Sequence, residues 1–403
     1  MSMKEIVILG AFDRYNYGDN IMPILFEMFL EKFYPTVSDR YSLVYTALTE
    51  SDLSRYKAKK TKAIADVFLK ADDVHSIIVI GGEVLCASST TLFLHMDENV
   101  NLASIIRAIK NKKLSIISDV FCAWHYRLPW EYPYIPKKIK SDVKVAFNTV
   151  GGGVSSLALG PRVHGVRQRL RDADFLSVRD SRTLKSLKGF CDPSVFPDSA
   201  IAMSYFATDE FLKENCRQDF TNLMQDDDYI CFQAAPEKSG TSPEKCMDML
   251  RLISKEHGLK IKLCPIGYAN GHDDLMFLRK IEELSDGEFS LHYDLNVWEI
   301  MSVIRYSKLY IGTSLHGAIT ALSYSVPHLG LNPNILKLEC FLSDWSIEPF
   351  NRCYSVDDMS GVVGVALKVC IENFRVHSNN LVKKALENNH QLVQALSLVE
   401  EEE

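Results

Sequence analysis

The residue with the clearest chemical potential is His316, which lies in the sequence Gly-Thr-Ser-Leu-His-Gly at residues 312–317. The apolar run at residues 309–311 predicts a buried strand, and Thr313 or Ser314 offers an N-cap oxygen for a following helix. His316 would then lie in the first turn of a helix that starts at the carboxyl end of a strand. Free backbone N–H groups and the helix dipole make such a helix start an anion site. An imidazole there suits proton transfer to a phosphorylated or carboxylated substrate, although a histidine that only caps or packs the helix gives the same pattern.

Two cations further along the chain are candidates for binding a charged substrate. Arg179 follows a predicted strand at residues 175–178, and a guanidinium can form a fork onto a carboxylate or phosphate. A structural pair with Asp180 at a helix cap explains it equally. Lys337 lies twenty-one residues beyond His316, where its charge could neutralise an anion, but a single lysine alone predicts nothing.

Several polar residues and glycines follow other predicted strands, and the carboxyl ends of parallel strands share one edge of a sheet. In the first half of the chain these residues are Asn16, Gly18, Asp19, Gly81 and Gly82, and in the second half His272 and Asp273. Polar side chains there offer contacts to sugar hydroxyls, and a glycine permits close backbone approach to a ligand. Asx turns, N-caps and tight turns explain the same residues, so both interpretations stay open.

The elements that must position these residues alternate between strand and helix, which predicts an α/β fold with parallel sheets. Predicted strands are residues 6–9, 42–46, 76–80, 114–118, 143–148, 175–178, 229–233, 260–265, 288–292 and 309–311. Predicted helices are residues 21–33, 181–187, 243–256, 273–284, 297–306 and 314–323. A chain of 403 residues is too long for one core, and the stretch 207–228 is polar and without strands. We therefore predict two Rossmann-like domains facing across a cleft, at residues 1–206 and 207–372, with a packing helix at 373–403.

Composition excludes several classes of protein. The formal net charge of −7 disfavours a nucleic-acid binder. Ten cysteines without C-x-x-C spacing, and histidines without paired spacing, predict no metal site. No apolar run approaches the ~18 residues that span a bilayer, and the first residues resemble a strand rather than a signal peptide, so we expect a cytoplasmic protein.

A local basic cluster consists of Arg162, Arg167, Arg169 and Arg171. It makes an anionic acceptor or a peripheral membrane contact a candidate partner, although a solvated helix face explains the cluster too.

Taken in order, the motifs resemble the polysaccharide pyruvyl transferase family from about residue 5 to 345. They are Asn16-x-Gly18-Asp19, Gly81-Gly82, Ser177-Val-Arg-Asp180, Pro197-Asp198, His272-Asp-Asp274, Ser314-Leu-His-Gly317 with Val326-Pro327, and Lys337. The resemblance implies a two-domain GT-B-like architecture. It also implies an enzyme that moves pyruvate from phosphoenolpyruvate onto two sugar hydroxyls as a cyclic ketal and releases phosphate, without a cofactor. The acceptor would be a glycan or a lipid-linked saccharide in the biosynthesis of cell-surface polysaccharide.

The resemblance also assigns roles to the candidate residues. His316 would be the catalytic acid or base. The donor would be held by Arg179, Ser314, Leu315, Gly317 and Lys337. The acceptor would face Asn16, Gly18, Asp19, Gly81, Gly82, His272 and Asp273, whereas Asp180 and Asp198 would be structural.

One departure from the family affects the donor site, because many members carry an arginine where this chain has Ser314. A serine supplies neither the fork nor the charge, and Arg305 is the candidate to compensate. Two alternatives stay open. A nucleotide-sugar glycosyltransferase of the same fold is disfavoured because residues 310–340 contain one acidic residue, Glu339. A non-catalytic glycan-binding relative is disfavoured because His316 and Lys337 are both retained.

Overall fold

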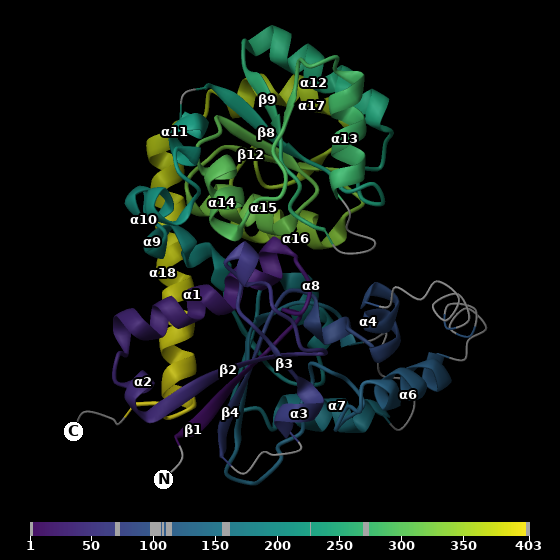
Figure 1. Cartoon of the computed structure of the whole chain (residues 1–403), viewed down its shortest axis with the longest axis vertical. Helices are drawn as coiled ribbons and strands as arrows, with labels where there is room; N and C mark the ends of the chain where they lie inside the picture. The colour runs from purple at the N-terminus through teal and green to yellow at the C-terminus, as the bar shows by residue number, and fades with distance from the viewer. Residues whose placement is uncertain are drawn as a thin grey trace.

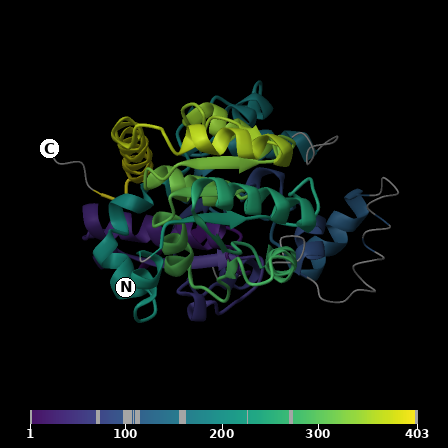
Figure 2. The same ribbon diagram turned by 90° about the horizontal axis from the view of Figure 1, so that it is seen from above.

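The computed structural model describes residues 3–68, 73–96, 106, 109, 115–154, 162–225, 227–268 and 274–399. Figure 1 shows two stacked α/β units, one with purple and blue elements and one with mostly green elements, and Figure 2 shows them from above. Each unit contains one parallel sheet with helices packed around it.

The first sheet has seven strands in the order β3-β2-β1-β4-β5-β6-β7, and each neighbouring pair is parallel. The strands are β1 Lys4–Leu9, β2 Tyr41–Ala47, β3 Lys62–Ala63, β4 Val74–Ile80, β5 Lys144–Val150, β6 Phe175–Val178 and β7 Ser194–Val195. The helices of this unit are α1 Tyr17–Phe33, α2 Val37–Arg40, α3 Ile64–Phe68, α4 Ser89–Met96, α6 Ser115–His125, α7 Arg162–Arg171 and α8 Ser181–Leu187. The strand order reverses between β1 and β4, which places a ligand crevice at their carboxyl ends.

The second sheet repeats this arrangement with six parallel strands in the order β10-β9-β8-β11-β12-β13. Its strands are β8 Tyr229–Gln233, β9 Lys260–Leu263, β10 Ser290–Leu291, β11 Leu309–Gly312, β12 His328–Leu331 and β13 Cys353–Tyr354. Its helices are α12 Pro243–His257, α13 Asp274–Leu284, α14 Val297–Arg305, α15 Leu315–Ser323, α16 Leu336–Trp345 and α17 Val356–Ala366. The order reverses between β8 and β11, so the second unit has its own crevice at these strand ends.

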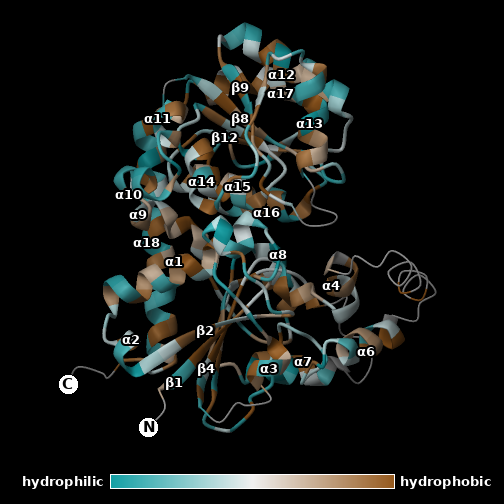
Figure 3. Ribbon diagram, in the orientation of Figure 1, coloured by the Kyte–Doolittle hydropathy of each residue, from teal (hydrophilic) through white to brown (hydrophobic). Residues whose placement is uncertain are grey.

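The central strands are continuously apolar because helices cover both faces of a parallel sheet. The last four residues of β1 are buried, and so is every residue of β8. Figure 3 shows the same distribution, with brown strands inside and more teal on the outer helices. These features confirm the predicted α/β class with two Rossmann-like units.

Two sequence predictions about elements are wrong. Residues 115–118, predicted as part of a strand, begin helix α6. The residues that α6 buries are Ser118 and Cys122, four apart, which is helical spacing. A short apolar run cannot distinguish a buried strand from a helix. Helix α1 begins at Tyr17 rather than at residue 21, so Pro23 lies inside the helix and not in its first turn.

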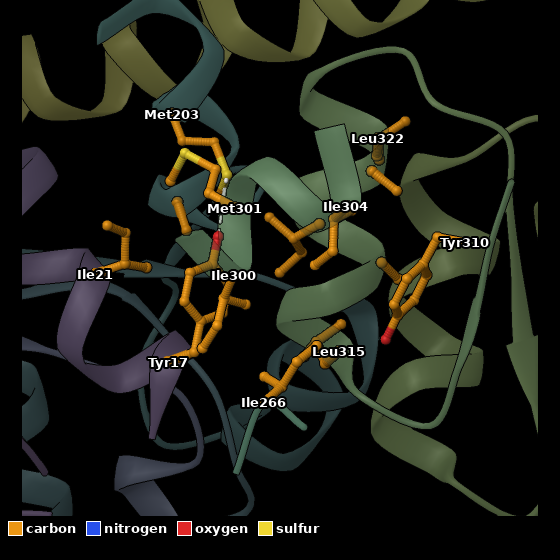
Figure 4. Packing of buried hydrophobic residues seen from close by; sticks show 14 of the residues in the cluster. Tyr17, Ile21, Met203, Ile266, Ile300, Met301, Ile304, Tyr310, Leu315 and Leu322 are labelled. Atoms are coloured by element: carbon orange, nitrogen blue, oxygen red, sulfur yellow. Dashed lines mark hydrogen bonds between the residues drawn. The ribbon is translucent and has the colours of Figure 1, made fainter. Parts of the chain in front are cut away.

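A continuous cluster of buried apolar side chains joins the two units. Figure 4 shows the part of this cluster where α1 of the first unit approaches α14 and α15 of the second. The hydroxyl of Tyr17 contacts the sulfur of Met203 at 3.7 Å and shares a 2.8 Å hydrogen bond with the hydroxyl of Thr320. Because these contacts are buried, the two crevices are held face to face.

Helix α18, Ile371–Ala395, runs beside both units and returns the chain to the first sheet (Figure 1). It packs against β5, where the amide of Asn148 exchanges hydrogen bonds of 2.6 and 3.0 Å with Asn388 and Asn389. Helices α9 Met203–Phe206, α10 Asp209–Asn215 and α11 Phe220–Gln225 connect β7 to β8, and the exact domain limits stay a prediction. Within the described ranges, no helix combines the length and the apolar content needed to cross a bilayer.

Candidate functional site

A cavity of about 240 Å³ lies where the two crevices meet. The first unit contributes residues from the loops after β1, β4 and β6, and the second from the loops after β8, β9 and β11 and from α16. The polar and charged residues that line the cavity are Arg14, Asn16, Asp19, Glu83, Tyr134, Arg179, Gln233, Lys238, Asp274, Thr313, Ser314, His316 and Lys337. Residues far apart in the sequence therefore line one shared cavity.

His316 lies in the first turn of α15, as the sequence predicts, and its side chain is nearly buried. Its Nε2 atom lies 3.7 Å from Oδ2 of Asp198 and has no hydrogen-bond partner among the described residues. Burial lowers the pKa of His316, and the carboxylate of Asp198 offsets this only in part. The imidazole is therefore neutral at neutral pH, and its free nitrogen can accept a proton.

Glycines on α1 and α15 leave room for the side chains packed around this histidine. A Cβ atom on Gly18, in the first turn of α1, would lie 1.9 Å from Nδ1 of His316. A Cβ atom on Gly317 would lie 2.0 Å from the hydroxyl of Tyr310. Gly18 and Gly317 do not line the cavity themselves. The missing Cβ of Gly18 leaves room for the imidazole, and that of Gly317 leaves room for Tyr310.

The start of α15 is partly occupied by the protein itself. Oε1 of Gln233 accepts hydrogen bonds from the N–H groups of Thr313 at 3.0 Å and Ser314 at 2.8 Å. Ser314 is the N-cap, and its hydroxyl accepts the N–H of Gly317. Among the described contacts, the first-turn N–H groups of Leu315 and His316 are not engaged by this network. The expected anion site is therefore narrower than the whole helix start.

Asp274 fixes the orientation of Gln233. Its Oδ2 atom accepts a 2.7 Å hydrogen bond from the Gln233 amide, and also the N–H groups of Ile266 and Gly267 at 2.9 and 3.0 Å. Burial raises the pKa of Asp274. Since the amide nitrogen of Gln233 is held by a carboxylate, its oxygen must face the helix start.

Arg179 is fully buried and held by carboxylates at both ends of its guanidinium. Its Nη1 atom is 2.9 Å from Oδ2 of Asp198, and its Nη2 atom is 2.9 Å from Oε1 of Glu83. Burial alone would lower the pKa of Arg179, but these carboxylates raise it above its usual value. Burial likewise opposes ionisation of Glu83, but the charges of Arg179 and Arg182 lower its pKa to about 2.

Arg179 also lies beside Asp180, the residue that follows it in the sequence. The structural pair with Asp180 at a helix cap is present, since Nε of Arg179 lies 3.8 Å from Oδ2 of Asp180, and Asp180 caps α8 by accepting the N–H of Thr183 at 2.6 Å. The contacts of Arg179 with Asp198 and Glu83 are shorter. Arg179 reaches the cavity, but its main partners belong to the protein. It therefore holds Asp198 beside His316.

Two lysines of the second unit line the cavity near the histidine. Lys337, in the first turn of α16, was predicted here, and burial lowers its pKa. Lys238 was not predicted, and burial together with the charge of Lys337 lowers its pKa to about 8. Arg305, expected to compensate for Ser314, does not line the cavity and instead contacts Asp209 at 3.2 and 3.3 Å. Lys238, and not Arg305, therefore adds a second lysine charge to the cavity.

The remaining predicted site residues differ in whether they line the cavity. Asn16, Asp19 and Gly82 line the cavity, and the Asn16 amide donates to Asp19 at 2.7 Å. Gly81, directly before Gly82, does not line the cavity. His272 and Asp273 lie outside the described residues.

Sequence reasoning missed a second polar cluster in the cavity, formed by Arg14 and Tyr134. Nη1 of Arg14 lies 3.5 Å from Asp13, and neither this nitrogen nor the Tyr134 hydroxyl has a hydrogen-bond partner among the described residues. Arg14, Glu83, Gln233 and Lys238 share a signal that was available, since each lies at or shortly after the end of a predicted strand. Tyr134 had no comparable signal because it lies in the long loop after α6.

Comparisons with known proteins agree with this architecture. The structure is similar to a UDP-N-acetylglucosamine 2-epimerase, with a TM-score of 0.56 and 11% identity, covering 100% of this chain and 98% of the other. It is also similar to MnaA of S. aureus in complex with UDP, with a TM-score of 0.52, 13% identity and coverage of 97% and 95%. The wall teichoic acid polymerase TagF gives a TM-score of 0.52 at 12% identity, with coverage of 98% and 88%. At these identities the likeness shows the fold alone, which is the predicted GT-B-like fold.

The sequence comparison is more specific. No curated protein matches the chain significantly. The family model described as polysaccharide pyruvyl transferase matches residues 16–334. The match begins at Asn16, directly before α1, and includes the start of α15.

Proposed function

This chain belongs to the polysaccharide pyruvyl transferase family and is therefore a transferase of glycan metabolism, and we propose that it moves pyruvate from phosphoenolpyruvate onto two hydroxyls of a sugar as a cyclic ketal. The observation that carries this proposal is the buried, unpartnered Nε2 of His316 in a cavity that also contains Lys238 and Lys337. The acceptor in this proposal is a glycan or lipid-linked saccharide of cell-surface polysaccharide synthesis.

The charges in the cavity suit a donor with two anionic groups. Phosphoenolpyruvate carries a carboxylate and a phosphate, and buried cations stabilise such groups strongly because little water screens them. Lys238 and Lys337 supply these cations, and the free N–H groups of Leu315 and His316 add hydrogen-bond donors. A three-carbon donor fits within the cavity volume of about 240 Å³, which lies just below the about 300–1,000 Å³ typical of ligand sites.

Ketal formation requires two proton transfers that a neutral histidine can begin. One acceptor hydroxyl adds to C2 of the enol phosphate while a proton reaches C3, which becomes a methyl group. The second hydroxyl then adds to C2, the C2–O bond to phosphate breaks, and its proton leaves with the phosphate. In our proposal His316 removes the first hydroxyl proton and delivers it to C3, and Asp198 stabilises the imidazolium between these steps.

Two polar residues of the first unit are our candidates for binding the sugar. Asn16 and Asp19 present an amide and a carboxylate to the cavity from the start of α1. Their mutual hydrogen bond leaves further donor and acceptor capacity for sugar hydroxyls. We therefore assign them to acceptor binding, and the donor to the second unit.

Calorimetric titration with phosphoenolpyruvate, UDP and UDP-hexoses tests this assignment. We expect saturable binding of phosphoenolpyruvate that weakens at least about tenfold in Lys337→Ala, because one buried charge–charge contact is lost. Lys245→Ala, on the exposed face of α12, is the matched control and should bind normally. His316→Ala should retain phosphoenolpyruvate binding but release no phosphate in the presence of acceptor.

Binding of UDP without binding of phosphoenolpyruvate would contradict the proposal. So would unchanged phosphoenolpyruvate affinity in Lys337→Ala. Thermal melting of each variant shows whether a loss of binding reflects unfolding instead.

A further inference from the structure

Helix α6 presents apolar side chains to solvent, which is the reverse of an ordinary surface helix. The exposed fraction is 73% for Trp124 and 57% for Ile117. The full stripe consists of Ile116, Ile117, Val120, Phe121 and Trp124. Their spacing of three, four and seven residues places them on one side of the helix, whereas Ser118 and Cys122 face the protein. A contiguous exposed stripe of this kind marks an interaction surface.

The apolar stripe lies close to the cavity. Helix α6 packs against α4, and the two lie side by side in Figure 1. Thr91 and Leu92 of α4 line the cavity that contains His316. Among the described elements, only helix α4 therefore separates a partner bound to α6 from the cavity where a glycan would react.

The surroundings of the stripe combine apolar and cationic groups. A groove of about 520 Å³ beside α6 is lined by Val120 and Trp124, by the cations Arg127 and Lys137, and by the carboxylates Asp119 and Glu131. The two cations are exposed, and each lies 3.6 Å from a single carboxylate, so these pairs are weak. In sequence, residues 105–140 contain eight Lys or Arg and two Asp or Glu, although the whole chain has a net charge of −7. An apolar stripe within a basic region complements a surface that is negatively charged outside and apolar beneath.

We propose that α6 docks this protein onto the surface of a bilayer containing anionic phospholipids. Ile117, Val120 and Trp124 enter the boundary between headgroups and acyl chains, and Arg127 and Lys137 contact the phosphates. Tryptophan is favoured at that boundary because its ring is apolar and its N–H is polar. The helix lies on the membrane and does not cross it. This inference does not depend on the identity of the donor.

Vesicle binding of the full chain tests the proposal. The probes are vesicles of phosphatidylcholine mixed with phosphatidylglycerol, and vesicles of phosphatidylcholine alone. We expect co-sedimentation with the anionic vesicles, weakened by salt, and a blue shift of tryptophan emission. Trp124 dominates that shift because Trp130 and Trp298 are buried already and the half-buried Trp345 lies in the second unit.

The decisive variant is Ile117→Ser with Val120→Ser and Trp124→Ser, which changes exposed side chains only. We expect at least about tenfold weaker co-sedimentation and an unchanged melting temperature. The matched control is Leu252→Ser with Met276→Ser, two exposed apolar residues of the second unit, which should bind like the unchanged protein.

Failure of the donor proposal and of the membrane proposal can be distinguished. Lys337→Ala should bind vesicles normally even if it loses phosphoenolpyruvate. No binding to anionic vesicles, or equal binding by the triple variant, would overturn the membrane proposal. Self-association that the triple variant abolishes, without vesicle binding, would overturn it in favour of a second copy of this chain.

Discussion

Replacing Arg179 by methionine should reveal how strongly the buried ionic network holds the first unit together. The substitution keeps an apolar stem but removes the guanidinium that contacts Glu83 and Asp198 at 2.9 Å. Asp198 is completely buried, so it would be left charged without its cation. Breaking a buried pair from one side costs about 3–5 kcal/mol.

The lowered pKa of Glu83 leads independently to a similar free energy for the loss of Arg179. Its fall from 4.5 to about 2 corresponds to about 3 kcal/mol of preference for the charged form, and Arg179 is the principal cation responsible. Because the pKa is lower in the folded state, this stabilisation is complete above about pH 4.5 and is lost as the pH falls from there towards 2. In the variant, burial without the cation raises the pKa of Glu83, so the carboxyl is protonated more easily.

The assay is urea denaturation of both proteins at neutral pH and near pH 4.5. We expect the free energy of unfolding to fall by about 3–5 kcal/mol at neutral pH and by distinctly less near pH 4.5, where the Glu83 carboxyl of the variant takes up a proton. Arg182→Met is the matched control, since Arg182 contacts the same Glu83 oxygen but is 32% exposed, and it should cost less than about 1 kcal/mol. A loss below about 1 kcal/mol in Arg179→Met, or a loss that does not change with pH, would refute the reasoning.

Two further predictions concern the catalytic cavity. Gly18→Ala should lower the rate of phosphate release about a hundredfold or more, because the new Cβ would lie 1.9 Å from His316 and must displace the imidazole by more than an ångström. Steady-state kinetics tests this prediction. The control is Gly361→Ala, whose Cβ meets nothing within 4 Å and which should release phosphate at the normal rate. The affinity for phosphoenolpyruvate should fall as the pH rises through about 8, because Lys238 loses its charge there. The affinity of Lys238→Arg should stay constant over this range, because arginine keeps its charge. Calorimetry that shows the same pH dependence for both proteins would contradict the reasoning.

The local features of the fold were predictable because they depend on neighbouring residues. The strand of residues 175–178 and the helix of residues 181–187 have the limits expected from the sequence, since Asp180 separates a short apolar run from a helix that it caps. The N-cap role of Ser314 and the place of His316 follow from the same kind of pattern. Such strand–turn–helix signals need no knowledge of the tertiary structure.

The parts of the site that were missed depend on contacts between distant residues. Gln233 reaches the start of α15 only because β8 lies beside β11, and Glu83 contacts Arg179 across 96 residues of sequence. The error at α6 has a related cause, since an apolar run is normally taken as buried, and here most of its side chains are exposed.

The return of α18 to the first sheet has a consequence for how the chain is synthesised. Asn148 is buried in β5, yet its amide is paired with Asn388 and Asn389, which the ribosome adds some 240 residues later. Domains usually fold as they emerge, in order from the N-terminus. Here the part of the first sheet that α18 covers, at β5 and β6, stays exposed until the second unit and α18 have been translated. Nascent chains stalled before α18 should therefore leave the first unit sensitive to protease, and release of the complete chain should protect it.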